Sequence, residues 1–462
     1  MITNEDKNFF TSICAAMNPA EAGDDFTHDE MPIYGCHVPD LIVFPENTKQ
    51  VSQIMVYCHN KKIPVTVRGA GTGLCGGAVA IKGGLLLSTA KMNKIIEVDK
   101  ATMTATVEPG VVLMDFASCV LEQGLFYPPE PGEKSASIGG NVMTNAGGMK
   151  AVRYGVTRDY VMGLEVVLAD GRILNLGGKV AKNCSGYSLL HLFIGSEGTL
   201  GIITKIILKL IPKPKKTISL LVPFSSPEEC ISAVPKILSA DILPTAVEFM
   251  QREVIEESEK YLGKQFPDKS ADAYLLISFD GADRADVTSR CDAAAEICLE
   301  CGAADAFIAD TSERLAGLWE ARSAFLEAIK SSTTEMDECD VVVPRDKIAE
   351  FVRFVSRLEA EQQMRIRYFG HAGDGNLHIY LCRDEMQEDE WLKRLDTVMG
   401  LLYEKACQLG GKVSGEHGIG HAKIDYLRLS EGDLYMELMA KIKKAFDPDN
   451  ILNPSKVVGG LD

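Results

Sequence analysis

The stretch IPVTVRGAGTGLCGG, at positions 63–77, joins a short β-branched run to a glycine-rich loop. The run at 63–67 predicts a strand, and the loop can present successive backbone N–H groups to a diphosphate because no side chains stand in the way. A dinucleotide turn of the Rossmann type would open a helix, whereas the next segments, 85–88 and 95–98, are predicted strands. No Gly-Lys-Ser/Thr of a P-loop follows either. The stretch therefore indicates another kind of phosphate-binding domain, or else an ordinary loop between strands.

Two further glycine-rich segments lie in the same half of the chain. SIGGNVMTNAGG at 137–148 supplies small residues, amides and hydroxyls against which a large planar ligand could lie. GSEGTLGIIT at 195–204 does the same before a strongly apolar predicted strand. Three such loops in one domain predict an extended cofactor.

A different pattern, FGHAGDGNLHIY, occupies positions 369–380. Gly373, Asp374 and Gly375 predict a tight turn into a strand, where a period of two places Asn376 and His378 on the same face. The turn can fold His371 back toward them. Each histidine could instead be a satisfied core or surface group.

Glu416 and His417, in the segment SGEHG, add a carboxylate and a further imidazole. Two imidazoles and a carboxylate suit zinc, iron or manganese, and three protein ligands leave positions open for a substrate oxygen. Because four polar groups share glycine-rich segments, we favour a metal site beside a base.

Composition bounds the class of protein. A chain of 462 residues with 46% hydrophobic content should form two or three domains. The net charge of −17 argues against nucleic acid and anionic membranes as partners. No apolar run reaches the roughly 18 residues of a membrane span, and the first residues lack the features of a signal peptide, so we expect a cytoplasmic protein.

The 13 cysteines are then expected to be reduced thiols. Cys298 and Cys301 form a CxxC preceded by Cys291, which indicates a packed helix face, and no group of four suits an iron–sulfur cluster.

The order of the predicted elements divides the chain into three parts. Residues 1–215 hold short β-rich runs and the glycine-rich loops, and end at the Pro- and Lys-rich segment IPKPKK. Residues 216–412 alternate strands with helices, which predicts an α+β cap with one antiparallel sheet covered by helices. Residues 413–462 contain a helix near 435–446, stopped by Asp447-Pro448.

Taken together, these motifs resemble those of the FAD-linked D-2-hydroxyacid dehydrogenases, within the vanillyl-alcohol oxidase superfamily. The matching segments are RGAGTGLCGGA, TNAGG, GSEGTLGIIT, GHAGDGNLH, SGEHGIG and FDPDNILNPSK, which span positions 38–456 approximately. The resemblance implies a two-part FAD-binding domain with an α+β cap, and a C-terminal segment that returns to the FAD domain.

The resemblance also implies which residues bind the cofactor. Covalent members carry a histidine in the diphosphate loop, and this loop has none, so FAD is expected to be bound non-covalently. The expected FAD-binding residues are Arg68, Gly69, Ala70, Gly71, Thr72, Gly73, Leu74, Pro131, Ser137, Gly140, Thr144, Asn145, Gly147, Glu197, Gly198, Ile203 and Asn453.

By resemblance, His371, His378 and Glu416 are the metal ligands and His417 is the base. A divalent ion (Fe²⁺, Zn²⁺ or Mn²⁺) would lower the pKa of the substrate hydroxyl, and the base would take its proton. Arg322, in LWEAR, matches the arginine that binds the substrate carboxylate. The alternative is an exposed helix arginine paired with a glutamate at i±4.

Asn376 is a further candidate for contacts to substrate or to metal-bound water. Asp337, Glu338 and Cys339 stand where some 2-hydroxyglutarate enzymes have a lysine, which favours a small monocarboxylate, D-lactate first. Glycolate or D-2-hydroxyglutarate oxidation, and a catalytically silent flavin relay subunit, stay open. A rival class is the alkyl-dihydroxyacetonephosphate or aldonolactone branch, which does not need the two-histidine, one-glutamate cluster.

The acceptor of the electrons is expected to be a separate molecule: another protein, a quinone or oxygen. By resemblance to anaerobic relatives, we expect an electron-transferring flavoprotein, with coupling to NAD by electron bifurcation or its reverse. The sequence leaves the oligomeric state open.

Overall fold

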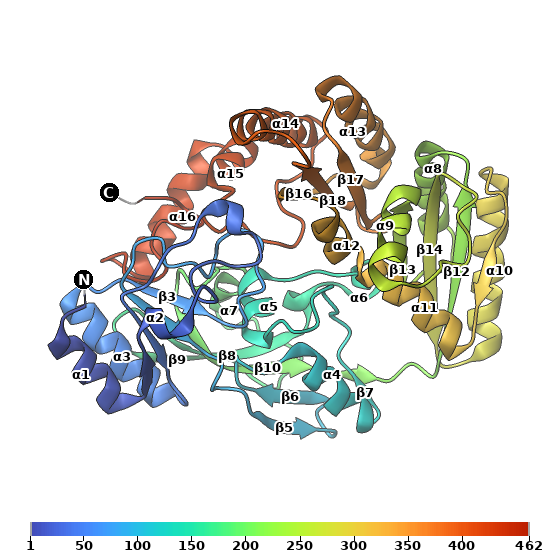
Figure 1. Cartoon of the computed structure of the whole chain (residues 1–462). Coiled ribbons are helices and arrows are strands. Elements are labelled where there is room, and N and C mark those ends of the chain that lie inside the picture. Colours follow the sequence, from blue (N-terminus) through green and yellow to red (C-terminus); the bar gives the residue numbers. More distant parts are fainter. Residues whose placement is uncertain (1, 461–462) are drawn as a thin grey trace. The chain divides into compact units, whose positions relative to one another are not determined.

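The computed structural model describes residues 2–460 and divides the chain into two compact units. The first unit contains residues 2–147, 156–213 and 416–460, and the second contains Gly148–Gly155 and Pro214–Gly415. Figure 1 follows the chain through both. The expected three-part division did not include the excursion of Gly148–Gly155, which carries helix α6 (Ala151–Tyr154) into the second unit.

The first unit is built on two main sheets. A four-stranded sheet has the order β1-β2-β4-β3, in which β4 runs parallel to both of its neighbours, and an antiparallel five-stranded sheet has the order β5-β6-β10-β8-β9. The strands of the first sheet are β1 (Ala15–Met17), β2 (Leu41–Phe44), β3 (Val65–Arg68) and β4 (Leu85–Ser88). Those of the second are β5 (Ile95–Asp99), β6 (Thr104–Val107), β8 (Val161–Val167), β9 (Ile173–Gly177) and β10 (Ile202–Lys209). A short pair, β7 (Leu125–Phe126) and β11 (Ile211–Pro212), completes the strands of this unit.

Helix α3 (Thr48–Lys61) shows how the core of this unit forms. The side chain of Asn47 caps its first turn by accepting a hydrogen bond from the N–H of Gln50. Val51, Ile54 and Cys58 are buried at helical spacing in one cluster with the apolar residues of β2 and β4. The other helices of the unit are α1 (Asn4–Ile13), α2 (Pro19–Ala22), η1 (Pro32–Tyr34), α4 (Leu113–Glu122), α5 (Ile138–Thr144), η2 (Thr157–Asp159), α7 (Leu189–Phe193), α15 (Ile424–Glu431) and α16 (Asp433–Phe446).

The C-terminal segment is anchored in the first unit by a buried cation. Lys443 of α16 pairs with Asp447 and donates hydrogen bonds to the carbonyl oxygens of Thr199 and Leu452, each at 2.8 Å. Leu452 also bridges to Val65 of β3. Lys443 thus ties the end of the chain to the loop before β10.

Replacing Lys443 by methionine should destabilise the first unit, because Asp447 and two carbonyl groups would stay buried without their cation. The expected cost is about 3–5 kcal/mol, or a fall of about 10 °C in melting temperature. The control is Lys444→Met, which makes the same change at an exposed neighbouring position. Equal melting temperatures for the two variants would contradict the anchoring role.

The second unit contains one antiparallel seven-stranded sheet of order β15-β12-β14-β13-β17-β18-β16. Its strands are β12 (Lys216–Phe224), β13 (Ala246–Gln251), β14 (Ala273–Gly281), β15 (Phe307–Ala309), β16 (Met336–Val342), β17 (Ile366–His371) and β18 (Asn376–Cys382). Most of their residues are buried on both faces, which is why they read as continuous apolar runs.

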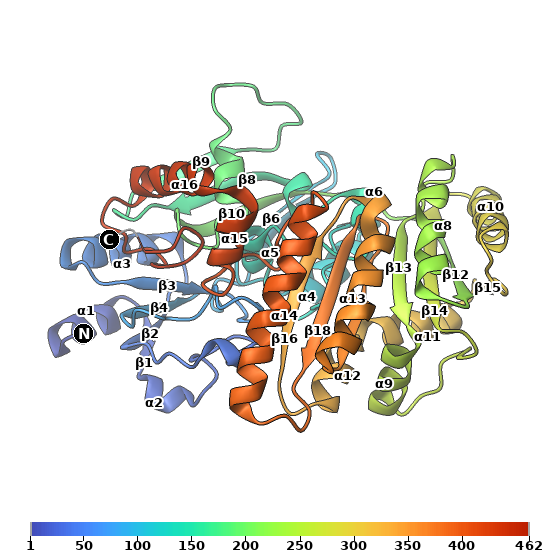
Figure 2. The same cartoon turned by 90° about the horizontal axis from the view of Figure 1, so that it is seen from above.

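Helices cover both faces of this sheet. Figure 2 shows α14 (Glu388–Gln408), α13 (Ile348–Gln362), α8 (Pro227–Ser239) and α10 (Arg284–Glu300) in a row along one face. Helices α9 (Arg252–Leu262), α11 (Ser312–Ser323) and α12 (Phe325–Ser332) pack against one another, and a short η3 (Arg345–Lys347) precedes α13. The expected α+β class with an antiparallel cap sheet is confirmed.

Several boundaries differ from the sequence predictions. The strand predicted from 63 begins at Val65, and the one predicted from Asp340 begins at Met336, because Asp337 and Glu338 pair with β18 despite their charge. The segment IPKPKK is not a plain linker, since Ile211 and Pro212 pair with β7. The segment 137–148 is largely the helix α5 rather than an open loop.

The thiols and the surface follow the sequence in part. None of the 13 cysteines, which all lie in the described part of the chain, forms a disulfide, and Cys291 and Cys298 are buried on α10 as a packed helix face. No helix within residues 2–460 has the length and apolar character needed to cross a membrane.

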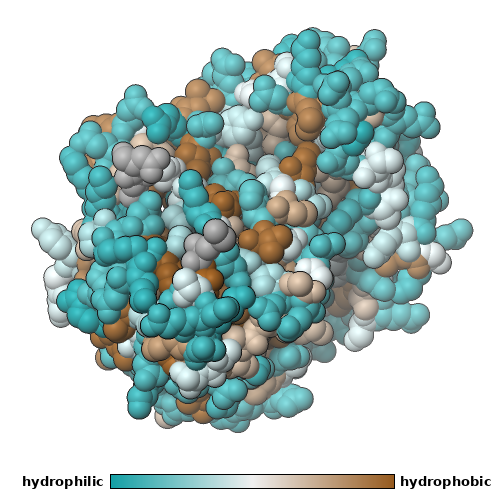
Figure 3. All heavy atoms as spheres, turned by 60° about the vertical axis from the view of Figure 1, so that its left-hand side comes forward, coloured by the Kyte–Doolittle hydropathy of each residue, from teal (hydrophilic) through white to brown (hydrophobic). Residues whose placement is uncertain are grey.

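On the face drawn in Figure 3, hydrophobic residues lie in separate groups among hydrophilic ones. Leu434, Leu438 and Ile442 of α16 are exposed at helical spacing, and the oligomeric state stays open.

Candidate active site

The glycine-rich loop after β3 has the features of a diphosphate nest. In the described chain, none of the backbone N–H groups from Gly69 to Leu74 donates a hydrogen bond to another protein group. At Gly73, a Cβ atom would meet nothing closer than Asp29 Oδ2 at 3.8 Å. Since these N–H groups share one loop and Gly73 has open space beside it, the loop fits a group with several acceptor oxygens.

Arg68 departs from the expectation for this loop. Its guanidinium donates to the carbonyl oxygens of His28 at 2.8 Å and Asp25 at 2.7 Å, and lies 5.5 Å from the ring of Phe26. A Cβ atom at Gly71 would lie 2.2 Å from Arg68 Nη2. The Arg68 side chain therefore holds the N-terminal segment, and its predicted contact with FAD stays a prediction.

The second glycine-rich segment lies beside the first. Ser137 Oγ caps α5 by accepting a hydrogen bond from the N–H of Gly140, and a Cβ atom at Gly69 would lie 2.2 Å from that oxygen. Thr144 Oγ1 donates back to the Gly140 carbonyl, and Asn145 caps the end of α5 in the left-handed conformation. The two segments thus form one surface of small residues and backbone groups.

Glu197 is buried, and its side chain holds the C-terminal segment. Its carboxylate accepts hydrogen bonds from the N–H groups of Ile419 and Gly420, each at 2.8 Å. Burial raises the pKa of this carboxyl, and the two N–H donors oppose that rise. Both oxygens of the side chain are thus used by the segment that follows His417, and the expected contact of Glu197 with FAD stays a prediction.

Other expected FAD-binding side chains are also engaged by the protein. Asn453 Nδ2 donates to the carbonyl oxygens of Gly77 and Glu197, so it joins two loops. Ile203 is buried in β10, and Pro131 is half-buried. A Cβ atom at Gly147 would lie 2.6 Å from Glu416 Oε2, which places that carboxylate against the TNAGG segment of the first unit.

In the second unit, the register of β17 and β18 brings the two predicted ligand histidines together. Phe369 pairs with His378, and His371 pairs with Asn376, so all four side chains share one face of the sheet. The turn between β17 and β18 needs Gly375, which has φ 93° and whose Cβ atom would lie 2.2 Å from the Val343 carbonyl.

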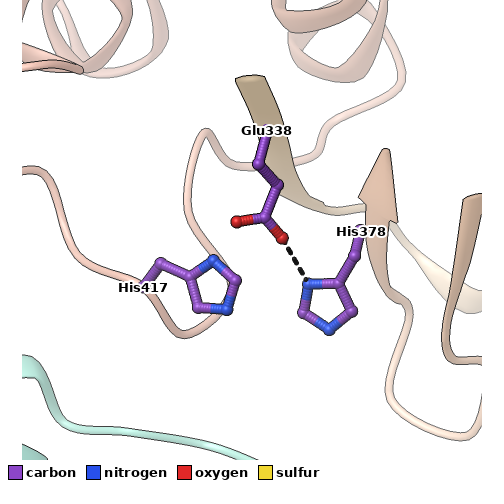
Figure 4. A group of neighbouring side chains, drawn as sticks. All are labelled: Glu338, His378 and His417. Atoms are coloured by element: carbon purple, nitrogen blue, oxygen red, sulfur yellow. Dashed lines mark hydrogen bonds and ion pairs between the residues drawn. The ribbon is translucent and has the colours of Figure 1, made fainter. Parts of the chain in front are cut away.

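Each histidine donates to its own buried carboxylate. His371 Nδ1 lies 2.9 and 3.0 Å from the oxygens of Glu248 in β13, and His378 Nδ1 lies 3.1 Å from Glu338 Oε1 in β16. Figure 4 shows the bond between Glu338 and His378. An ionised carboxylate only accepts hydrogen bonds, so in a neutral ring this contact puts the proton on Nδ1 and leaves the lone pair on Nε2.

The two Nε2 atoms face each other at 3.4 Å. Two lone pairs at this distance repel, so the contact needs either a proton on one Nε2 or a cation between the rings. Two ligands of a tetrahedral ion with bonds of about 2.05 Å would be about 3.3 Å apart. The pair of imidazoles, each oriented by a carboxylate, therefore fits a divalent metal.

Asp340 fixes the chain that leads to the other predicted ligand. It is buried on the histidine face, where Oδ1 accepts from Asn376 Nδ2 at 2.7 Å. Its Oδ2 accepts from Ser414 Oγ at 2.9 Å and from the N–H of Gly415 at 3.0 Å. Asp340 thus holds the last two residues of the second unit, immediately before Glu416.

The substitution Asp340→Asn should release this anchor, because an amide nitrogen would face a donor in place of one acceptor oxygen. We expect metal affinity to fall about 10- to 100-fold. Asp337→Asn is the matched control, since Asp337 is buried in the same strand but points to the opposite face. Metal titration of both variants tests this, and equal affinities would contradict the anchor.

Asn376 has a more limited role than expected. Both hydrogens of its amide are used, since Nδ2 also donates to the Val341 carbonyl at 2.9 Å. A Cβ atom at Gly415 would lie 2.2 Å from this amide, so Asn376 packs directly on the anchored segment. Its Nδ2 thus holds the strand that carries Asp340, and its Oδ1 is the atom left for the predicted contact to a ligand.

Arg322 is not the exposed helix arginine of the alternative interpretation. It is buried at the end of α11, and its partner is Glu248 of β13, at 2.8 Å from Nε and 2.6 Å from Nη2. The guanidinium lies 4.5 Å from the centre of the Phe369 ring. Arg322 is therefore on the histidine face, as a substrate-binding arginine would need to be.

Sequence reasoning missed the acidic residues that complete this face, Glu248, Glu338 and Asp340. Tyr380 was missed too; burial, followed by the charge of Glu338, raises the pKa of its hydroxyl well above the ordinary value. The spacing of Glu338 and Asp340 in a strand was a usable signal, because charged residues two apart share a face.

Comparison with known proteins places the chain in a family. A model described as "FAD linked oxidases, C-terminal domain" matches residues 213–457, and one described as "FAD binding domain" matches residues 39–177. The fold and these matches define an FAD-dependent oxidoreductase. The chain belongs to the FAD-linked D-2-hydroxyacid dehydrogenase family.

Relatives cover nearly the whole chain. A D-lactate dehydrogenase of Anaerostipes hadrus is 50% identical over 95% of this chain and 93% of the relative. The glycolate oxidase subunit GlcD of Bacillus subtilis is 41% identical over 94% and 91%. Among solved structures, p-cresol methylhydroxylase with substrate bound is 19% identical, with a TM-score of 0.81 over 100% of this chain and 98% of that one. An alkyldihydroxyacetonephosphate synthase has a TM-score of 0.74 at 19% identity, over 98% and 86%, which shows the shared fold alone.

Proposed function

We propose that the protein oxidises D-lactate to pyruvate, with non-covalently bound FAD as the hydride acceptor and a divalent metal at the imidazole pair. The observation that carries the metal is the pair of Nε2 atoms, 3.4 Å apart, on rings that are each oriented by a carboxylate. The observation that favours the substrate is the 50% identity to a D-lactate dehydrogenase along nearly the whole chain.

The proposed ligands are His371, His378 and Glu416. Glu416 is supported by chain connectivity: Gly415 is held on Asp340, beside the histidines, and the next Cα atom follows at about 3.8 Å. Iron, zinc and manganese all accept this ligand set. When bound, the ion would supply Lewis acidity to the substrate hydroxyl, and FAD would supply the acceptor for the hydride.

The residues of the chain provide binding and proton transfer. Arg322 binds the substrate carboxylate through the part of its guanidinium that Glu248 does not occupy. His417 takes the proton of the C2 hydroxyl, and the C2 hydrogen leaves with its electron pair, so that the alcohol becomes a ketone. Glu197 holds the two residues after Gly418 and so fixes the segment that carries His417.

Charge on the histidine face favours a monocarboxylate. Glu248, Glu338 and Asp340 are all buried there, so a second substrate carboxylate would meet like charges. We therefore expect D-lactate and glycolate to be better substrates than D-2-hydroxyglutarate.

The test is an anaerobic panel of D- and L-2-hydroxy acids, scored by the absorbance of the bound flavin. Fast bleaching by D-lactate, slower bleaching by L-lactate and weak bleaching by D-2-hydroxyglutarate would support the proposal. A preference for glycolate would favour the function that the name of the Bacillus subtilis relative states. If none of these acids bleaches the flavin, the result would contradict the proposal and favour a catalytically silent flavin subunit.

We further propose that the electrons pass to an electron-transferring flavoprotein in the cytoplasm. This is supported by the cysteine pattern, which offers buried thiols on a helix face and no four-cysteine cluster in the described chain for onward transfer. Reduction of a purified flavoprotein by D-lactate and this enzyme tests the proposal. Direct quinone reduction at a higher rate would contradict it.

A further inference from the structure

Glu248 contacts two groups that serve different ends of the substrate. It is fully buried in β13, and its carboxylate accepts hydrogen bonds from His371 Nδ1 at 2.9 and 3.0 Å. The same carboxylate accepts from Arg322 Nε at 2.8 Å and pairs with Nη2 at 2.6 Å. One side chain therefore joins a proposed metal ligand to the proposed carboxylate clamp.

Only an ionised carboxylate can serve both partners. His371 Nδ1–H and the Arg322 guanidinium are donors, so the residue between them must offer acceptors on both sides. The Arg322 guanidinium supplies a positive charge at 2.6 Å from Glu248 Oε2, which favours this ionised form although the residue is buried. A glutamine would present a donor to one of the two.

The consequence for His371 is a fixed tautomer. Because Nδ1–H donates to Glu248, the lone pair of the neutral ring lies on Nε2, which is the atom that faces His378. The consequence for Arg322 is that the plane of its guanidinium group is fixed. Glu248 holds Nε and Nη2, the Phe369 ring lies against the guanidinium at 4.5 Å, and Nη1 remains for a ligand.

We propose that Glu248 is a positioning residue that sets the His371 ligand and the Arg322 clamp in one geometry, and so couples metal binding to recognition of the substrate carboxylate. The inference rests on the proposed function for the roles of His371 and Arg322. Glu248 would orient His371 so that its Nε2 lone pair faces the metal, and it would orient the guanidinium of Arg322 toward the substrate carboxylate.

Glu338 provides a matched control. It is equally buried on the same face and accepts from His378 Nδ1 at 3.1 Å, whereas the charge partner of Arg322 is Glu248. Glu338→Gln should therefore disturb one imidazole and leave the arginine in place, whereas Glu248→Gln should disturb both.

The experiment compares the full-length FAD-loaded wild type with Glu248→Gln and Glu338→Gln in two measurements. The first is the affinity for Zn²⁺ or Mn²⁺ without substrate, by competition with a chelator. The second is the dissociation constant of D-lactate from the concentration dependence of flavin reduction, and of oxalate by spectral titration, both at saturating metal.

Both variants should lose about 10- to 100-fold in metal affinity. Only Glu248→Gln should also weaken D-lactate and oxalate binding, by tenfold or more, at saturating metal. Weakened ligand binding of equal size in both variants, or unchanged metal affinity in Glu248→Gln, would overturn the proposal.

A replacement variant and a second criterion cover the cases in which Glu248→Gln does not fold or D-lactate does not react. If Glu248→Gln does not fold, Glu248→Asp takes its place, since its shorter chain keeps the charge but cannot reach both partners. If the wild type binds metal and oxalate but is not reduced by D-lactate, the proposed reaction is wrong. The comparison of metal and oxalate affinities between the variants still tests whether Glu248 positions His371 and Arg322.

Discussion

Replacement of His378 by alanine should remove the metal and slow flavin reduction by D-lactate about 1000-fold, at unchanged FAD content. The reason is that Lewis-acid assistance is worth several kcal/mol, and about 1.4 kcal/mol corresponds to each factor of ten. FAD content should persist because the glycine-rich loops belong to the first unit, whereas His378 lies in β18 of the second. Metal analysis and stopped-flow absorbance measure the two effects.

The control for this variant is His191→Ala, which removes an exposed histidine of the first unit. It should keep its metal and its rate. His378→Gln separates loss of the ligand from a packing defect, since it fills more of the space beside Glu338. If metal-free His378→Ala were reduced at the wild-type rate, the imidazole pair would have no part in the reaction.

Replacement of His417 by glutamine should slow flavin reduction about 100- to 10,000-fold, the usual contribution of a general base. The metal and FAD should both stay bound, because His417 is proposed as a base and not as a ligand. The wild-type rate should fall toward acid pH as the base becomes protonated, and the variant should lose that dependence.

Measurement of the rate from about pH 5 to 9 distinguishes a base from a structural residue, since the ordinary titration of histidine lies in this range. A variant with a low rate but the full wild-type pH profile would contradict the assignment. A variant that also lost its metal would indicate that His417 is itself a ligand.

The predictable part of the site was the part encoded locally. His371, His378 and the glycine turn between them lie within eight residues, and a period of two is enough to place Asn376 and His378 on one face. The fold class followed from strands and helices that alternate in the second unit. The glycine-rich loops stood out because few residues other than glycine let a backbone approach a ligand so closely.

The missing part depends on strand register between distant segments. Glu248 lies 123 positions before His371, and no pattern in the sequence states that β13 pairs with β17. For the same reason the excursion of Gly148–Gly155 into the second unit was not foreseen. Arg68 and Glu197 were assigned to FAD by family resemblance, and no local pattern indicated that their side chains bind backbone carbonyl and N–H groups of the chain itself.

The central claim is that a divalent cation held by His371 and His378 is needed to oxidise the alcohol. The most direct test is to determine the metal content of the purified flavoprotein before and after chelation, and to follow anaerobic flavin bleaching by D-lactate in each state. We expect one ion per chain, loss of bleaching when the ion is removed, and recovery when zinc, iron or manganese is returned. Full-speed bleaching by protein without any bound metal would contradict it.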